Sequence, residues 1–295
     1  MKSKKILIIY ILLVLAMLIW GLSFVWYKEA FENFNPVSII FIRLFISVIL
    51  LVPYAFISKR ILKLEKKHFH LFLLLAFFEP FLYFIGESFG LKFVSATVAS
   101  VIISLIPLIT PVAAYIFYRE KFSGQNILGL FISFFGVMLV VYFSDNEIHS
   151  SWKGIALLFL SVISTVGYTA FVKKLTSHYN PLSIIIYQNI IGAVYFIPLV
   201  LWLDIEALCQ TTWSFHALLP LLKLSVFASS IAFVFFIQGI RILGMTKATV
   251  FANFIPVFAC FFAWYILNDK ISPWQITGIL FVIIGLLLSQ VKVIK

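Results

Sequence analysis

Ten long apolar segments follow one another along this chain, separated only by short polar joins. Each is about 20 residues long, which is what an α-helix needs to cross about 30 Å of hydrocarbon. The joins carry Pro, Asn, Ser and Gly, residues that commonly begin or end helices, and none can hold a soluble domain. The sequence therefore predicts an all-α polytopic membrane protein with ten transmembrane helices, at residues 6–27, 36–57, 69–91, 95–118, 125–143, 153–173, 181–202, 216–241, 246–267 and 274–291.

Composition indicates the same class. The chain is 63% hydrophobic and 11% charged, whereas a soluble domain is about half apolar and about a quarter charged. The net charge of +11 does not indicate nucleic-acid binding, because the basic residues lie in the joins and form no stripe interleaved with exposed aromatic residues. We expect the lipid bilayer, and no nucleic acid, to contact this surface.

The basic residues predict the orientation. Of 22 Lys and Arg residues, sixteen fall inside when the N-terminus is placed in the cytoplasm, two lie within spans (Arg43 and Lys223), and four fall outside: Lys28, Lys92, Lys153 and Lys270. Cytoplasmic joins carry such an excess, so both termini are expected inside a cytoplasmic (inner) membrane. The basic first residues followed by the apolar stretch Ile6 to Trp20 imitate a signal peptide, but the apolar run continues through Val25, which is too long for one, so we expect a retained first helix.

The first half of the chain returns in the second half. A shift of 149 positions aligns, without a gap, these pairs: Gly90 and Gly239, Lys92 and Arg241, Thr97 and Thr246, Pro107 and Pro256, Glu120 and Asp269, Lys121 and Lys270, Gly129 and Gly278, Gly136 and Gly285. Shifts of 145 and 146 align Pro36 with Pro181, Pro53 with Pro198, Gly21 with Gly167 and Lys28 with Lys174. The pattern predicts two five-helix repeats, residues 1–145 and 146–295.

An odd number of spans in each repeat means that the second repeat is inverted relative to the first. Inverted repeats are a recurring plan of secondary transporters, because two pseudo-symmetric halves can exchange conformations and open a midplane site to either face. The predicted fold therefore favours transport.

The repeated motifs resemble those of a known family. In each half a Pro stands thirteen positions before an acid–Lys pair, and two glycines seven positions apart follow. With Trp20-Gly21 and Arg43, this pattern is similar to the drug/metabolite transporter superfamily, specifically its EamA-type permeases. The resemblance implies export or exchange of small metabolites, often amino acids or their derivatives, through a central cavity between the halves. It fixes neither the substrate nor the coupling ion.

Glu79 is the main candidate for chemistry. Ionisable side chains within a span are costly to expose to lipid and usually face the protein interior. Glu79, Tyr83 and Glu87 stand at i, i+4 and i+8 and share one helix face, while Pro80 removes a backbone donor and should kink the helix. Our hypothesis is that Glu79 is the principal polar residue of the cavity and binds a substrate amine or takes up a proton. The alternative is an ion pair with Arg43 or Lys223 that serves only assembly.

The other ionisable residues have two interpretations each. Glu87 lies nearer the outer boundary, which favours a solvated or Lys92-paired acid over a cavity role. Arg43 is expected to pair with an acid or with helix carbonyls. Lys223 shares a face with Ser230 and either meets a carboxylate or extends to the outer interface.

The remaining candidates are uncharged or terminal. Ser104 and Asn253 are equivalent under the 149 shift and are candidates for the cavity wall, as are the aromatic Trp20 and Tyr83, although 18% of the chain is aromatic. Pro107 and Pro256 are predicted hinges. We expect salt-bridged caps at the ends of the fourth and ninth helices, where a cation suits a helix C-terminus, formed by Glu120, Lys121, Asp269 and Lys270.

The sequence thus predicts a transporter that exports a small metabolite, an amino acid or derivative, by alternating access. We expect a small-molecule substrate, a coupled proton if Glu79 carries one, and no catalytic residue, cofactor or metal site. One alternative is transport of another solute, such as a sugar conjugate or a drug. Others are a membrane-embedded enzyme, for which a facing set of catalytic side chains is missing, and a non-transporting assembly protein.

Overall fold

The computed structural model describes residues 2–118, 124–143, 151–268 and 270–290, and throughout these ranges regular structure is helical. Most of the elements are α-helices, η1 and η4 are 3₁₀ turns, and η2 and η3 are π-helical. In chain order they are α1 (Lys2–Ala30), α2 (Pro36–Ile57), η1 (Lys66–His68), α3 (Phe69–Ala76), η2 (Phe77–Leu82), α4 (Tyr83–Phe93), α5 (Ala96–Ile103), α6 (Ile106–Tyr118), α7 (Gly124–Tyr142), α8 (Trp152–Leu175), α9 (Pro181–Leu203), α10 (Ile205–Gln210), α11 (Phe215–Lys223), η3 (Leu224–Ala232), α12 (Phe233–Leu243), α13 (Met245–Thr249), η4 (Val250–Phe254), α14 (Ile255–Leu267) and α15 (Pro273–Gln290).

Each predicted span coincides with one helix or with a run of consecutive helices. Seven stretches of the described residues are long and apolar enough to cross a membrane: Ile6–Ala30, Pro36–Ile57, Lys66–Phe93, Trp152–Leu175, Pro181–Leu203, Phe215–Leu243 and Met245–Leu267. Shorter apolar helices occur at Ala96–Pro111 and Pro273–Gly285. The all-helical, polytopic class agrees with the sequence, while the count of ten crossings and the side of the termini stay predictions.

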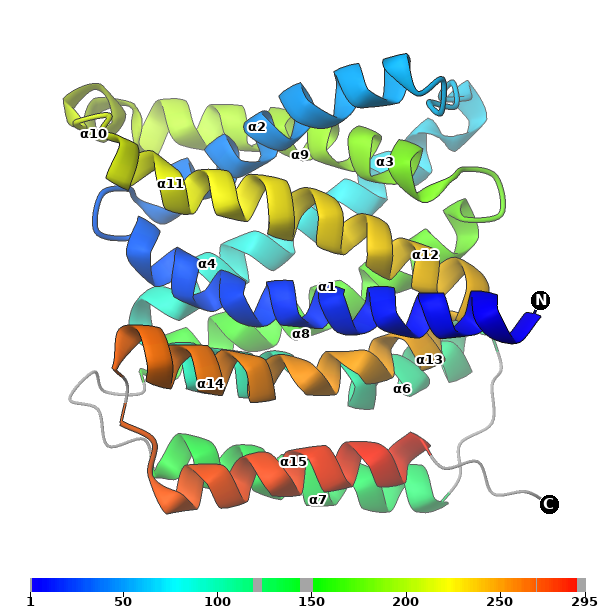
Figure 1. Cartoon of the computed structure of the whole chain (residues 1–295), viewed down its shortest axis with the longest axis vertical. Coiled ribbons are helices and arrows are strands. Elements are labelled where there is room, and N and C mark those ends of the chain that lie inside the picture. Colours follow the sequence, from blue (N-terminus) through cyan, green and yellow to red (C-terminus); the bar gives the residue numbers. More distant parts are fainter. Residues whose placement is uncertain (1, 119–123, 144–150, 269, 291–295) are drawn as a thin grey trace.

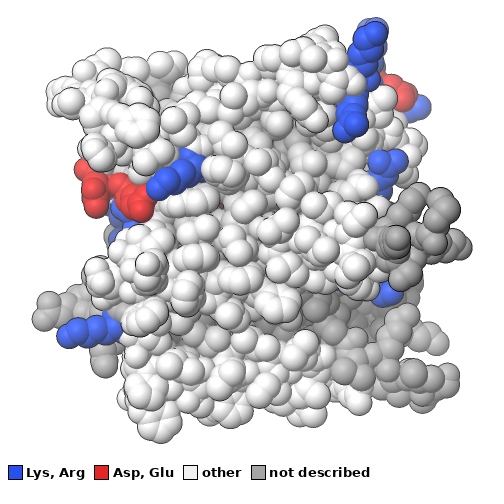
Figure 2. All heavy atoms as spheres, viewed as in Figure 1, with Lys and Arg blue, Asp and Glu red and all other residues white. Residues whose placement is uncertain are grey.

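The helices run roughly parallel to one another and are stacked from α2 and α9 at one end to α7 and α15 at the other (Figure 1). The start of α1 and the end of α15 lie on the same side of this stack. Charged side chains on the face in Figure 2 gather toward the two sides where helices end, with a broad uncharged band between them. Such a band suits the hydrocarbon core of a bilayer, with the helices crossing it.

Two helices are interrupted at corresponding positions of the two halves. The π-helical η2 separates α3 from α4, and the π-helical η3 separates α11 from α12. The 149 shift places residues 77–82 on 226–231, inside η3. In η2 the backbone of Glu79 is non-helical (φ −147°, ψ 117°) directly before Pro80, which agrees with the predicted disturbance by a proline that lacks an N–H. In η3 the hydroxyl of Ser230 donates to the carbonyl of Ser225 (2.8 Å).

The paired helices α2 and α9 are held by a contact at each end. Asp204, just after α9, accepts hydrogen bonds from the N–H and hydroxyl of Ser38 in the first turn of α2 (2.9 and 2.7 Å). Leu62, just after α2, donates its N–H to the hydroxyl of Ser183 in the first turn of α9 (2.9 Å). Ser38 and Ser183 are equivalent under the 145 shift, so the two contacts use the same position of each helix, although Ser38 donates and Ser183 accepts.

The helices α7 and α15 pack through their glycines. A Cβ atom added to Gly136 would lie 2.5 Å from the carbonyl oxygen of Gly278, and one added to Gly285 would lie 2.6 Å from that of Gly129. Between these crossings the Ser133 hydroxyl donates to the carbonyl of Val282, its own equivalent under the 149 shift (3.3 Å). Gly136 thus meets Gly278, the equivalent of Gly129, and Gly285, the equivalent of Gly136, meets Gly129. This self-complementary pattern is that of a two-fold contact, and the two helices run antiparallel.

Candidate functional site

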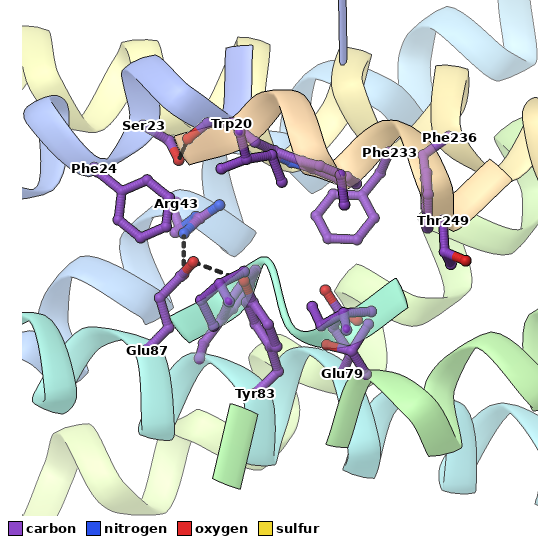
Figure 3. Close-up of a pocket in the computed structure, with 16 residues that line it drawn as sticks. Trp20, Ser23, Phe24, Arg43, Glu79, Tyr83, Glu87, Phe233, Phe236 and Thr249 are labelled. Atoms are coloured by element: carbon purple, nitrogen blue, oxygen red, sulfur yellow. Dashed lines mark hydrogen bonds and ion pairs between the residues drawn. The ribbon is translucent and has the colours of Figure 1, made fainter. Parts of the chain in front are cut away.

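A small cavity lies in the centre of the bundle, lined by side chains from both halves of the chain, among them residues of α1, η2, α4 and α12. About 40 Å³ of it is open to the centres of water molecules, enough for a few waters, since one needs only about 10–15 Å³ on this measure. Its walls combine aromatic and apolar side chains with a few polar ones (Figure 3): Trp20, Ser23, Phe24, Arg43, Glu79, Tyr83, Phe84, Glu87, Ile103, Ile106, Thr165, Phe233, Phe236, Thr249, Ala252 and Ile255.

Arg43 is fully enclosed at one end of this cavity. Its Nε donates to the Ser229 hydroxyl (2.6 Å) and its Nη1 donates to the Tyr27 hydroxyl (2.7 Å). The guanidinium lies 4.1 Å from the centre of the Phe84 ring and 3.9 Å from the Glu87 carboxylate. Since α2 and η3 come from different halves, Arg43 joins the second interruption to the first repeat, and it pairs with an acid as the sequence suggested.

Glu87 differs from its sequence-based interpretation. We expected a solvated or Lys92-paired acid near the outer boundary, but its side chain is buried and lines the cavity. One oxygen accepts from the Tyr83 hydroxyl (2.8 Å) and the other lies beside Arg43 (3.9 Å), whereas Lys92 is exposed. The interpretation was wrong because position along a helix gives depth but not which neighbouring helix supplies the partner.

Glu79 lies in η2, away from Arg43 and Glu87 in the view of Figure 3, where no dashed line reaches it. Its side chain is 4% exposed and its Oε2 has no hydrogen-bond partner among the described residues. The alternative ion pairs are not found there, because Arg43 pairs with Glu87, and Lys223 lies 3.4 Å from Glu29. A buried carboxylate oxygen without a partner is costly, so this position is set up to receive a proton or a donor from a ligand.

The local chain explains why Glu79 faces the cavity. The added Cβ of a residue at Gly192 in α9 would collide with the ring of Pro80, and one at Gly167 in α8 would collide with the Phe78 ring. These glycines therefore let η2 wedge between α8 and α9. Residues 78 and 80 fill that wedge, while the extended backbone at Glu79 directs the residue between them to the cavity.

Trp20 and Tyr83 line the cavity as predicted for candidate wall residues. The Trp20 indole donates to the carbonyl of Ala228 in η3 (3.3 Å) and packs edge-on against Phe233 and Phe236, with ring centres 5.1 Å apart in each case. Lys223 instead meets Glu29 in a half-buried pair (3.4 Å) outside the residues that line the cavity.

Ser104 and Asn253 are not among the lining residues of this cavity, contrary to our expectation. The Ser104 hydroxyl donates to the carbonyl of Val101 in its own helix (2.6 Å), because a serine in an apolar helix can satisfy itself in this way. Asn253 is buried and its side-chain nitrogen and oxygen have no partner in the described part of the chain. Both residues occupy the breaks between α5 and α6 and within η4.

The predicted hinges and caps have mixed outcomes. Pro107 and Pro256 are each the second residue of a helix, α6 and α14, so the chain bends before them rather than at them. Lys270 is exposed. Glu120, Lys121 and Asp269 lie outside the described residues.

The sequence did not single out several polar residues that form the site. Ser23, Thr165 and Thr249 line the cavity, and Tyr27 and Ser229 hold Arg43. Hydroxyl side chains are common in apolar helices and carry no spacing signal. Asn189 joins α9 to α2 and η3 by donating to Ser47 and to the carbonyl of Ser229 (2.8 and 3.2 Å).

Comparison with known proteins places the whole chain among transporters. The profile of the EamA-like transporter family matches twice, at residues 7–142 and 152–290, in agreement with the resemblance seen in the sequence. An uncharacterized transporter of Archaeoglobus fulgidus is 26% identical over 294 residues, which cover 99% of each chain. The uncharacterized transporter YoaV of Bacillus subtilis is 24% identical over 275 residues, covering 92% of this chain and 93% of YoaV.

A solved structure shares the fold. A crystal structure of another protein superposes with a TM-score of 0.71, covering 95% of this chain and 97% of the other, at 11% sequence identity. At that identity the similarity concerns the helical architecture alone.

Proposed function

Because the chain belongs to the EamA-like transporter family, we propose that it exports a small metabolite, an amino acid or a derivative of one, across the cytoplasmic membrane. In this proposal two inverted five-helix halves, with both termini in the cytoplasm, alternate around the central cavity. The described conformation is closed, because the cavity has room for only a few waters. Admission of the solute therefore requires the halves to move.

The observation that carries this proposal is Glu79. It is a buried carboxylate, on a helix interruption, that faces the cavity and has an oxygen without a partner among the described residues. Transporter binding sites are built from such interrupted helices near the midplane. A residue that served assembly alone would have its oxygens occupied by the protein. In the proposed cycle Glu79 exchanges a proton for the substrate, or binds the substrate directly.

The contacts between the halves support the alternating mechanism. The glycine crossings of α7 with α15 are reciprocal under the 149 shift, and α2 and α9 are joined at both ends through the equivalent residues Ser38 and Ser183. The family profile matches each half separately. Two halves with equivalent contacts can exchange conformations without a change in the energy of those contacts, which is what alternating access requires.

Solute flux into proteoliposomes tests the proposal. A panel of labelled amino acids and amino-acid derivatives, including decarboxylated amines, is presented to the wild type and to Glu79→Gln, with and without a pH gradient. We expect uptake of at least one solute by the wild type and its loss in the variant. If Glu79 also carries the coupled proton, the residual flux of the variant no longer responds to the gradient.

A matched control distinguishes the loss of a carboxylate in the cavity from the loss of one at the surface. Glu206→Gln makes the same chemical change at an exposed residue of α10 and should leave flux unchanged. Wild-type flux that survives Glu79→Gln would contradict the role of Glu79, and a wild type that moves no amino acid or derivative would contradict the substrate class.

A further inference from the structure

Three aliphatic hydroxyl side chains of the cavity wall commit their protons to their own helices. Ser23 donates its proton to the carbonyl of Trp20 (2.7 Å), Thr165 donates to that of Ser161 (3.1 Å), and Thr249 donates to that of Met245 (3.1 Å). Each can therefore act toward a ligand only as an acceptor, although Thr249 is fully buried and Thr165 is the more accessible of the two threonines (6% exposed). The unpartnered Oε2 of Glu79 is a fourth acceptor.

Most donors in the cavity wall are held by the protein itself. The Trp20 indole donates to Ala228 (3.3 Å) and the Tyr83 hydroxyl donates to Glu87 (2.8 Å). Arg43 donates through Nε and Nη1 to Ser229 and Tyr27, and one face of its guanidinium is covered by Phe84. Its remaining N–H groups form no hydrogen bond with the described residues, but the charge of the guanidinium is already balanced by Glu87 at 3.9 Å.

The charges of the side chains in the cavity wall also favour a cationic ligand. Among the residues that line the cavity, Arg43 is balanced by Glu87 at 3.9 Å, and Glu79 has no such partner in the described chain. A ligand with one positive charge neutralises the ionised site, whereas a zwitterion leaves its net charge unchanged and an anion increases it. In a site with little water the neutral combination is favoured, because an uncompensated buried charge is strongly unfavourable.

We propose that the transported solute is an organic amine with an apolar body and no free carboxylate, whose ammonium group binds Glu79 and the acceptor hydroxyl of Thr165. An ammonium group supplies three N–H donors and no acceptor, which complements this wall. The rings of Trp20, Phe233 and Phe236 provide the apolar contact and a favourable surface for a cation. The inference rests on the proposed transport function and narrows its substrate class.

Three probes with the same phenylethyl body separate the charge types: 2-phenylethylamine, phenylalanine and 3-phenylpropionate. Their binding to the purified full-length protein in detergent is measured by titration calorimetry. We expect 2-phenylethylamine to bind at least about tenfold more tightly than phenylalanine, the scale of one hydrogen bond to a charged group, and 3-phenylpropionate to bind most weakly. Equal or tighter binding of either carboxylate, or no binding of the amine at millimolar concentration, overturns the proposal.

Variants identify the atoms responsible. Glu79→Gln should weaken amine binding at least about tenfold and remove most of its advantage over phenylalanine, while Glu206→Gln should change neither. Thr165→Val keeps the side-chain shape but removes an acceptor, and should weaken amine binding at least about tenfold, the scale of one hydrogen bond to a charged group. This second variant tests the site even if Glu79→Gln does not fold. Unchanged amine binding in Thr165→Val, or in a folded Glu79→Gln, contradicts the proposed site.

Failure of this inference is distinguishable from failure of the transport proposal. Flux of an amino acid that is lost in Glu79→Gln, together with no preference for the amine, would keep the transport function and reject the amine class. Specific amine binding without flux of any solute would support the site and reject transport.

Discussion

The two π-helical interruptions occupy equivalent places in the two halves, yet they differ in how well their polar groups are satisfied. In η3 the Ser229 hydroxyl accepts from Arg43, its carbonyl accepts from Asn189, and the Ala228 carbonyl accepts from Trp20. In η2 the Glu79 carboxylate has an oxygen to which no described residue donates. The polar groups of η3 named here are thus held by hydrogen bonds, whereas η2 keeps a carboxylate oxygen that is free to accept a hydrogen bond from a ligand. A pseudo-symmetric scaffold can therefore carry chemistry on one side only.

The largest expected effect follows from removal of the anchor. Arg43→Met removes the charge beside Glu87 and the donors to Ser229 and Tyr27, so it leaves a buried carboxylate without compensation. We expect the free energy of unfolding, measured in detergent, to fall by about 3–5 kcal/mol. The double variant Arg43→Met/Glu87→Gln should recover part of this loss. A loss that the second substitution does not reduce would mean that the ion pair is not its cause.

A matched pair of substitutions tests the comparison directly. Ser229→Ala leaves the Nε of Arg43 without its acceptor and should lower the free energy of unfolding by about 1.5–3 kcal/mol. Glu79→Gln should not lower it, because the amide replaces a buried carboxylate that has an unpartnered oxygen, yet it should abolish flux. If Glu79→Gln lowers the free energy of unfolding more than Ser229→Ala does, the proposed difference between η2 and η3 is wrong.

The symmetric contact between the halves can be tested at the glycines. Gly136→Ala would bring a Cβ within 2.5 Å of the Gly278 carbonyl oxygen, so the helices must separate, at a cost of about 1–3 kcal/mol. Gly285→Ala, the equivalent change, should cost a similar amount. Gly124→Ala is the control, since a Cβ there would meet no described atom within 4 Å. Unequal losses at the two equivalent glycines would contradict a symmetric contact.

The smallest effect is expected for Lys223, the span lysine that lies outside the cavity lining. Its pair with Glu29 (3.4 Å) is about 30% exposed, and such pairs contribute less than about 1 kcal/mol because water screens them. Lys223→Met should therefore change neither the unfolding free energy nor flux beyond this scale. A large loss of flux would place Lys223 in the transport path and contradict the assignment of the transport chemistry to η2 alone.

The sequence predicted the helices well because bilayer thickness and apolar length determine them physically. It also predicted the first interruption, since Pro80 cannot donate a backbone hydrogen bond. The second interruption has no proline within Leu224–Ala232 and was missed. Its serines bond to carbonyls of their own helix, which apolar helices permit at many positions without breaking.

The details of the cavity were harder to predict. Arg43 and Glu87 come from different helices, α2 and α4, and their pairing depends on how each helix is rotated about its axis. The residue pattern of one helix does not supply that rotation relative to another helix. The direction in which the hydroxyls of Ser23, Thr165 and Thr249 donate likewise depends on rotamers, so the acceptor-rich wall becomes visible only in three dimensions.

The end contacts of α2 and α9 have a mechanical consequence. Because Asp204 binds the first turn of α2 and Ser183 binds the segment after α2, these two helices cannot slide past each other without rupture at both ends. The pair is therefore expected to move as one unit at its end of the stack. Displacement during a working cycle must then come from the helices that are already segmented, with η2, η3 and η4 as their joints.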